Sequence, residues 1–429
     1  MRDALAPQDG LYVLCVRGPE REDVRVVGAL RALLVAPEDP QALLAKLADP
    51  RVHIVSLTIT EKGYCRDPST SDLSPSHPAI AHDLASPQAP RSAPGVLVEA
   101  LRSRRIAGVA PFTVLSCDNL SSNGPATKRV TTQFAALCNP DLAKWIDDRV
   151  AFPSTMVDRI VPATTDDDRA NVMERLGVVD AWPVVTEPFF QWVVEDRFSD
   201  GRPRLEDSGA TIVPDVAPFE LAKLRLLNGT HSALAYLGYL AGFETISAAV
   251  ADPAFARFAR GLMDEEVTPT LIAHGLTDLA SYKRKLFERF QNPRLRHRTW
   301  QIAMDGTQKL PQRTLSVIKE RLDAGASIRR LALVVAAWMR YVAGVDEQGR
   351  AIDVRDPLAA KLATIAEAAG GDPAKLAFGL LGMGEVFPAE LAADPRFAGQ
   401  VTSALRTLLQ KGARATVDEL EGPFSGASA

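Results

Sequence analysis

The sequence predicts two domains: an α/β domain of residues 1–210 and a mostly α-helical domain of residues 211–429. In the first half, short apolar β-branched runs alternate with helical patterns, which is typical of a largely parallel sheet covered by helices. From Pro218 onward one helical pattern follows another, so we expect the boundary within residues 206–216. A chain of 429 residues that is 46% hydrophobic is long enough for two cores.

The first domain is expected to contain four short strands before residue 120. The run HIVSLT is apolar and β-branched, which suits a sheet buried on both faces. Thr165 is the expected N-cap of a helix with an acidic first turn. Strands are predicted at residues 11–16, 24–27, 53–58 and 112–116, and helices at residues 40–48, 96–105, 127–137, 142–147 and 166–177.

Two stretches of this domain carry no clear helical pattern. Residues 67–94 are rich in Pro, Ser and Asp and are expected to be irregular, with one helical turn near residues 80–84. Residues 183–196 are expected to form two extended runs hinged near Pro188.

The second domain is predicted as a succession of helices without an internal repeat. The predicted helices are residues 218–240, 254–263, 277–290, 310–324, 327–341, 357–369, 373–381, 388–393 and 396–412.

Composition excludes several classes of protein. A formal net charge of -4 without a basic stripe argues against a nucleic-acid partner. No apolar run approaches the ~20 residues that span a bilayer, and the N-terminus shows no secretory signal. The cysteines are scattered without a C-x-x-C pair, and no H-E-x-x-H pattern is present, which argues against a disulfide framework or a zinc site. We therefore expect a cytoplasmic protein with no metal and no membrane partner.

The stretch from Pro218 to Gly242 concentrates polar side chains in a helical pattern. On a straight α-helix Lys223, Glu220, His231 and Asn228 would fall at about 0°, 60°, 80° and 140°, on one broad face. Lys223 and His231 would lie about 12 Å apart, close enough for both to touch one sugar-sized substrate. The alternative is a half-buried helix with a few satisfied polar groups.

The run K-x-x-x-x-N-G-x-H-S, from Lys223 to Ser232, resembles the signature of the polyol-specific long-chain dehydrogenases, the mannitol dehydrogenase family. Five further blocks resemble family blocks in the family's order, so the resemblance spans most of the chain and is specific. They are ITEKGY (59–64), LSCDN (115–119), MVDRIVP (156–162), EPFFQWVVED (187–196) and HRTWQIAMDGTQKLPQR (297–313). The resemblance implies a Rossmann-like first domain that binds NAD and a helical catalytic domain.

The resemblance implies roles for five residues in reduction of a ketone. Lys223 is the candidate general acid/base, and its pKa must be depressed from about 10.4 for it to act as a base near neutrality. Asn119 and Asn228, one from each domain, are the candidate donors to the carbonyl oxygen. His231 is expected to bind a substrate hydroxyl, and Glu220 to relay a proton beside the lysine.

The same resemblance implies which residues contact the nicotinamide half of the cofactor. Glu61, Asn119, Val157 and Asp158 match family contact positions. Without the resemblance, Asp158 and Arg159 would be read as a structural ion pair. His297 and Trp300 would likewise be read as surface and core residues.

The chain departs from the family at its beginning. It has no G-x-G-x-F-H-R-A-H turn and no G-x-G-x-x-G anywhere, so we expect the first βαβ unit to be missing. That unit would supply the pyrophosphate turn and the acidic residue on the ribose. Weak NAD binding is therefore expected, and the choice between NAD and NADP stays open.

Substrate preference is read from Gln301, where mannitol dehydrogenases carry an arginine. The blocks at residues 60–67, 297–313 and 344–357 are closer to the fructuronate reductases, which implies interconversion of D-fructuronate and D-mannonate. The protein is expected to be a monomer. Lys309 resembles the family's second substrate lysine, and the substrate carboxylate is expected on Arg298, Lys309 or Arg313. A mannitol–fructose dehydrogenase and a truncated, non-catalytic binding protein are the alternatives.

Overall fold

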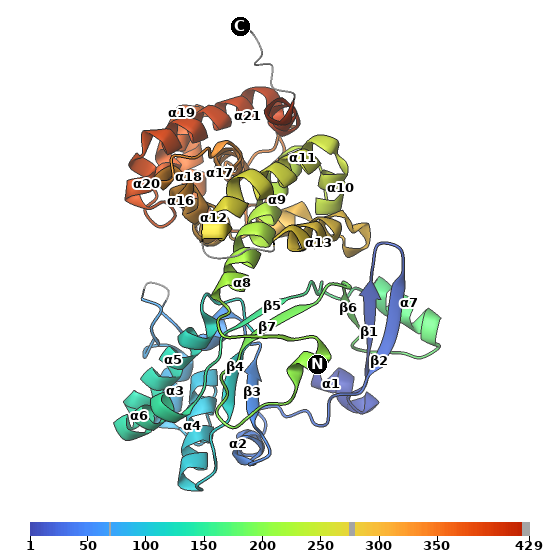
Figure 1. Cartoon of the computed structure of the whole chain (residues 1–429), viewed down its shortest axis with the longest axis vertical. Helices are drawn as coiled ribbons and strands as arrows, with labels where there is room; N and C mark the ends of the chain where they lie inside the picture. The colour runs from blue at the N-terminus through green and yellow to red at the C-terminus, as the bar shows by residue number, and fades with distance from the viewer. Residues whose placement is uncertain (68–69, 274–278, 423–429) are drawn as a thin grey trace. The chain divides into compact units, whose positions relative to one another are not determined.

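A computed structural model describes residues 1–67, 70–273 and 279–422 (Figure 1). The chain divides into two compact units. The first comprises Met1–Arg17 and Arg21–Glu220, and the second comprises Gly18–Glu20 and Leu221–Ala429.

The strands of the first unit that lie in the described ranges form three small sheets. One has the order β2 (Glu22–Val27), β1 (Tyr12–Arg17), β6 (Val184–Thr186); the next pairs β3 (Ile54–Leu57) with β4 (Thr113–Ser116); the last has the order β5 (Thr155–Asp158), β7 (Gln191–Glu195), β8 (Thr211–Val213). Pairs β1–β6, β3–β4 and β7–β8 are parallel, whereas β1–β2 and β5–β7 are antiparallel. The α/β class is confirmed.

The prediction of one largely parallel sheet is corrected by these pairings. Only residues 18–21 separate β1 from β2, and a parallel connection needs a dozen or more residues, so the two strands form an antiparallel hairpin. The strands β5 and β8 were not predicted. Each has three or four residues, too short to show a period-2 pattern in the sequence.

Among the described residues of the first unit, six helices have at least eight residues: α2 (Pro40–Ala48), α3 (Pro78–Ala85), α4 (Ala93–Ile106), α5 (Asn123–Cys138), α6 (Pro140–Arg149) and α7 (Asp166–Leu176). Thr165 caps α7 as predicted, in a capping box with Asp168. The single turn expected near residue 80 is the full helix α3. Apolar side chains of α4, α5 and α6 form one core with β3 and β4.

The second unit is helical, and within the described ranges the last strand of the chain ends at Val213, which confirms the predicted change of character. Its helices are α8 (Ala217–Ala222, which begins in the first unit), α9 (Thr230–Leu240), α10 (Ile246–Ala251), α11 (Pro253–Gly261), α12 (Thr268–Ala273), α13 (Ala280–Gln291), α14 (Thr299–Ala303), α15 (Gly306–Leu310), α16 (Ser316–Asp323), α17 (Arg329–Val342), α18 (Ala359–Ala369), α19 (Pro373–Leu381), α20 (Ala389–Ala393) and α21 (Pro395–Glu421). The predicted start of α13 at residue 277 lies outside the described residues.

In the described part of this unit, π-helical segments interrupt the succession at Lys223–Gly229, Leu262–Val267 and Pro311–Leu315. π-helical turns are rare and occur frequently at functional sites. The last predicted helix, residues 396–412, ends at a break in α21. Gly412 has φ +79°, and a further helical stretch continues from there to Glu421.

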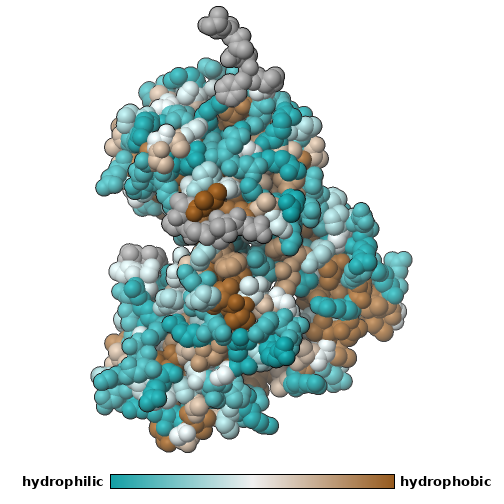
Figure 2. Space-filling view, in the orientation of Figure 1, coloured by the Kyte–Doolittle hydropathy of each residue, from teal (hydrophilic) through white to brown (hydrophobic). Residues whose placement is uncertain are grey.

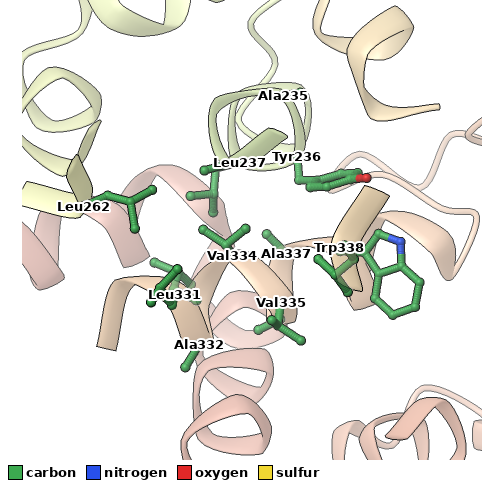
Figure 3. Close-up of a cluster of buried hydrophobic side chains, with 14 of the residues drawn as sticks. Ala235, Tyr236, Leu237, Leu262, Leu331, Ala332, Val334, Val335, Ala337 and Trp338 are labelled. Carbon is green, nitrogen blue, oxygen red and sulfur yellow. The ribbon is translucent and has the colours of Figure 1, made fainter. Parts of the chain in front are cut away.

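Helix α17 is the centre of the second unit's core. Its residues from Leu331 to Met339 are all buried, as expected for a helix surrounded by others. Trp338 and Val334 lie among Tyr236, Leu237 and other apolar side chains (Figure 3). The visible surface of this unit is largely hydrophilic (Figure 2). None of the helices in the described ranges is long and apolar enough to cross a bilayer.

Candidate active site

The polar stretch that begins at Lys223 does not form the straight α-helix assumed from the sequence. Residues Lys223–Gly229 form a π-helical segment between α8 and α9. A turn of about 4.4 residues reduces the angle between Lys223 and Asn228 from about 140° to about 50°. The two side chains therefore leave the helix on the same side, which the α-helical calculation did not predict, and the 12 Å estimate no longer applies.

The π segment is fastened by two arginines. Arg225, in the segment, pairs with Glu320 of α16, with 2.8 Å between Nη1 and Oε2. Arg313 Nη1, from the π segment Pro311–Leu315, donates to the carbonyl of Asn228 at 3.4 Å and to Ser232 Oγ at 3.0 Å. Lys223 is buried with only 9% of its surface exposed, and Asn228 is half-buried.

His231 lies one residue into α9, with its ring between two others. The ring centroids of Phe290 and His297 are 5.4 Å and 5.2 Å away. Its Nε2 is buried and has no hydrogen-bond partner within the part of the chain that the structure describes. An unpartnered buried polar atom is costly, so a native protein that retains one commonly does so for a functional reason.

The charge state of His231 follows from its surroundings. Burial holds the pKa of His231 well below its usual value, and His297, Arg313, Arg289 and Lys309 lower it further. The imidazole is therefore neutral. Its unpartnered Nε2 can donate or accept a hydrogen bond with a substrate hydroxyl, depending on the tautomer.

His297 also belongs to this cluster. Without the family resemblance, the sequence alone predicted His297 to be a surface residue. It is half-buried, and burial followed by Arg289 lowers its pKa to about 4. Its carbonyl accepts from Ile246 N at 2.9 Å, and Arg296 before it adopts φ +44°. The sequence pattern gave no sign of this residue because a loop, not a helical face, places it beside His231.

The block at residues 297–313 is anchored by its own backbone and by α17. Lys309 Nζ donates to the carbonyls of Ile302 at 3.2 Å and Met304 at 2.5 Å, which orients the ammonium group. A Cβ on Gly306 would lie 2.4 Å from Trp338 Nε1, so only glycine allows this approach.

The candidates for the substrate carboxylate occupy different surroundings. Arg298 and Gln301 are exposed, and Arg298 lines a hollow of about 560 Å³ together with Glu244, Trp300, Asp346, Arg350 and others. Lys309 and Arg313 lie near enough to His231 to lower its pKa. Of the three candidate cations, Lys309 and Arg313 therefore lie near His231.

In the first unit, two polar loops follow the parallel pair β3–β4. Leu57 and Ser116 are register partners, so Glu61 and Asn119 follow strands that end at the same sheet edge. Asp118 fastens the first loop by accepting from Ile59 N at 3.0 Å and Thr60 N at 2.9 Å. The side chains of Glu61 and Asn119 are exposed. Ligands of α/β sheets gather at such an edge.

The start of β5 is joined to the same edge by Asn123. Its Nδ2 donates to the carbonyls of Asp118 at 3.1 Å and Thr155 at 2.9 Å, and its Oδ1 accepts from Thr155 N at 2.9 Å. Val157 and Asp158 lie at the end of β5, half-buried and buried respectively. Glu61 and Asn119 thus offer a carboxylate and an amide where β3 and β4 end, whereas Val157 and Asp158 lie at the opposite end of β5 from its junction with that edge.

Glu220 is the last residue of the first unit. Both of its carboxylate oxygens accept from Ser122 N, at 3.1 Å and 3.2 Å. Ser122 stands three residues after Asn119, so this contact, within the first unit, ties the loop of Asn119 to the first turn of α8.

A Rossmann-like unit with polar side chains at its strand ends, followed by a helical unit with a buried lysine and a neutral histidine, defines a two-domain dehydrogenase. The Mannitol dehydrogenase Rossmann domain matches residues 1–207, and the Mannitol dehydrogenase C-terminal domain matches residues 215–409. The chain belongs to the mannitol dehydrogenase family of oxidoreductases, which confirms the resemblance found in the sequence.

Similar proteins differ in their named activities. D-mannonate oxidoreductase of Escherichia coli (strain K12) is 48% identical over 97% of this chain and 85% of its own length. The uncharacterized oxidoreductase YeiQ of the same organism is 49% identical over 95% of this chain and 83% of its own. The solved structure of Pseudomonas fluorescens mannitol 2-dehydrogenase, a ternary complex with NAD and D-mannitol, matches with a TM-score of 0.84 and 41% identity, covering 98% of this chain and 85% of the other.

The structure also bears on metal binding. Across the described ranges, no three His, Cys, Asp or Glu side chains gather as they would around a metal ion. The expectation that the reaction needs no metal stays a prediction, as do the roles assigned to individual side chains.

Proposed function

We propose that this chain interconverts D-fructuronate and D-mannonate with NAD(H), using Lys223 as the general acid/base. The observation that carries the proposal is the helical segment in which the buried Lys223 and Asn228 share one side, followed by His231 with its unpartnered Nε2. The 48% identity to D-mannonate oxidoreductase supports the choice of substrate.

Reduction of a ketone places negative charge on the carbonyl oxygen, which then needs a proton. Asn119 and Asn228 are the proposed amide donors to that oxygen, and Lys223 delivers the proton as the charge develops. Lys223 is buried, and a general base near neutrality requires the pKa of a lysine to lie below its usual value. In the reverse reaction, the oxidation of D-mannonate, Lys223 accepts the hydroxyl proton and Glu220 passes it to solvent.

NADH, when bound, supplies the hydride. Its nicotinamide half would be held at the strand ends by Glu61, Asn119, Val157 and Asp158. We therefore assign residues 1–210 as the cofactor-binding domain and residues 211–429 as the substrate-binding domain. NAD is proposed over NADP because a similar structure contains NAD.

The substrate is held by groups of the helical unit. His231 is proposed to bind a hydroxyl through its neutral ring, and Lys309, oriented by two carbonyls, to bind the carboxylate. Gln301 and Arg298 are secondary candidates at the rim. The second candidate function is a mannitol dehydrogenase, favoured by the similarity to the Pseudomonas fluorescens enzyme.

Steady-state turnover with D-fructuronate and D-fructose, each with NADH and NADPH, tests the proposal. We expect kcat/KM for D-fructuronate with NADH to exceed that for D-fructose by at least 10²-fold, because a cation left facing a neutral hydroxymethyl group forfeits a charge-assisted bond. Preference for D-fructose would favour the second candidate. We also propose that the protein is a cytoplasmic monomer. Size-exclusion chromatography with light scattering would test the oligomeric state.

A further inference from the structure

We propose that Arg313 is a positioning residue that holds the Lys223–Asn228 π segment in register, and that it does not bind the substrate carboxylate. The inference rests on the proposed function, because it takes Lys223 and Asn228 as the reacting lysine and the oxygen donor. The sequence had left Arg313 as one of three candidates for binding the substrate carboxylate, and the positioning role replaces that assignment.

The contacts of Arg313 point to the helix backbone. Its Nη1 donates to the carbonyl of Asn228 and to Ser232 Oγ, so one guanidinium group spans the end of the π segment and the first turn of α9. The backbones are equally close, since a Cβ on Gly229 would lie 3.1 Å from the carbonyl oxygen of Arg313. The segments Lys223–Gly229 and Pro311–Leu315 thus pack directly against each other.

A π segment needs such support because the α-helix is the ordinary alternative. Return to α-helical winding would rotate Asn228 by roughly 90° relative to Lys223 and separate the two side chains. Widening of a turn disturbs the regular pairing of carbonyls, and a cationic donor on the Asn228 carbonyl offsets that loss with a charge-assisted hydrogen bond.

The support itself is built into the chain around residue 311. Pro311 lacks the N–H that would donate to residue 307, which favours a widened turn there and places Arg313 on it. Glu320 of α16, a few residues on, pairs with Arg225 in the middle of the other π segment. Residues 311–320 therefore hold the segment at two points.

The two assignments of Arg313 predict different kinetics for Arg313→Met. If Arg313 positions the π segment, kcat should fall at least tenfold with D-fructuronate and by the same factor with any neutral ketose the wild type accepts, while KM changes less than threefold. If Arg313 binds the carboxylate, KM for the acid alone should rise tenfold or more, which would overturn the proposal. Where the wild type accepts only the acid, the division between kcat and KM decides. Arg313→Lys, which keeps a cationic donor, should restore part of kcat.

Two further variants guard against misfolding as the explanation. Gly229→Ala presses on the Arg313 carbonyl and removes no polar group, so it should also lower kcat at unchanged KM. Arg104→Met removes a buried arginine that donates to the carbonyls of Leu47, Asp49, Val52 and Ala110 in the first unit; it should lower the Tm and leave kcat unchanged.

Hydrogen exchange of the full chain tests the inference without turnover. Amides of residues 223–230 should lose at least tenfold protection in Arg313→Met and not in Arg104→Met. Unchanged protection together with unchanged kcat would overturn the positioning role. A wild type that turns over no sugar acid but shows the exchange difference would refute the proposed function and leave the pinning of the segment intact.

Discussion

Glu220 accepts two hydrogen bonds from a single backbone N–H, that of Ser122, at 3.1 Å and 3.2 Å from its two carboxylate oxygens. The carboxylate thereby joins the loop that carries Asn119 to the first turn of α8, within the first unit. The proposed proton relay and a purely positioning role both use this side chain, so they must be separated by substitution.

Glu220→Gln separates them. An amide oxygen can still accept from Ser122 N, but an amide cannot relay a proton, so we expect kcat to fall at least tenfold at neutral pH with little change in the Tm. Glu220→Ala should lower both, because the Ser122 N–H loses its acceptor. Turnover and calorimetry of the two variants are the measurements, and wild-type kcat in Glu220→Gln would restrict Glu220 to positioning.

The histidine pair predicts a pH dependence of stability. His297 has a folded-state pKa of about 4, below its unfolded value of ~6.5, so the unfolded chain binds more protons between these values. Its contribution to the free energy of unfolding is fully present above pH ~6.5 and is lost as the pH falls toward 4. His231 acts in the same direction.

Denaturant unfolding between pH 7 and pH 5 measures this effect. We expect the wild type to lose stability across that range and His297→Asn, which cannot titrate, to lose measurably less. His53→Asn, at an exposed histidine, is the control and should retain the wild-type slope. Identical slopes in wild type and His297→Asn would contradict the lowered pKa of His297.

Gly306 tests the packing of the 297–313 block. A Cβ there would lie 2.4 Å from Trp338 Nε1 and 2.7 Å from the Tyr236 hydroxyl, so Gly306→Ala should cost about 1–3 kcal/mol of unfolding free energy. Gly399→Ala is the matched control. Gly399 lies inside α21 with nothing within 4 Å of its Cβ position, and alanine there should stabilise by roughly 0.5–1 kcal/mol. A neutral Gly306→Ala would contradict the close approach.

Features fixed by local chemistry were predictable from the sequence. Helices α2 and α19 begin and end where predicted, because an aspartate cap and a proline at the first helical position set each start. The Thr165 cap of α7 was equally predictable. The class of the fold and the family followed from such patterns and from ordered motifs.

Features fixed by contacts distant in sequence were not predictable. The π segment depends on Arg313 and Glu320, which stand about 90 residues later, and an α-helical period calculation cannot include them. His297 reaches His231 from a loop whose carbonyl is held by Ile246 N. The sequence therefore predicted candidate residues and missed the winding that places two of them, Lys223 and Asn228, on one side.

The central claim, that Lys223 is the general acid/base, is tested most directly by Lys223→Ala. Turnover of D-fructuronate with NADH should fall by about 10²-fold or more, while NADH affinity measured by calorimetry stays within twofold of wild type, because the lysine is proposed to touch the reacting oxygen and not the cofactor. A variant with near-normal turnover would contradict the role of Lys223 and the mechanism built on it.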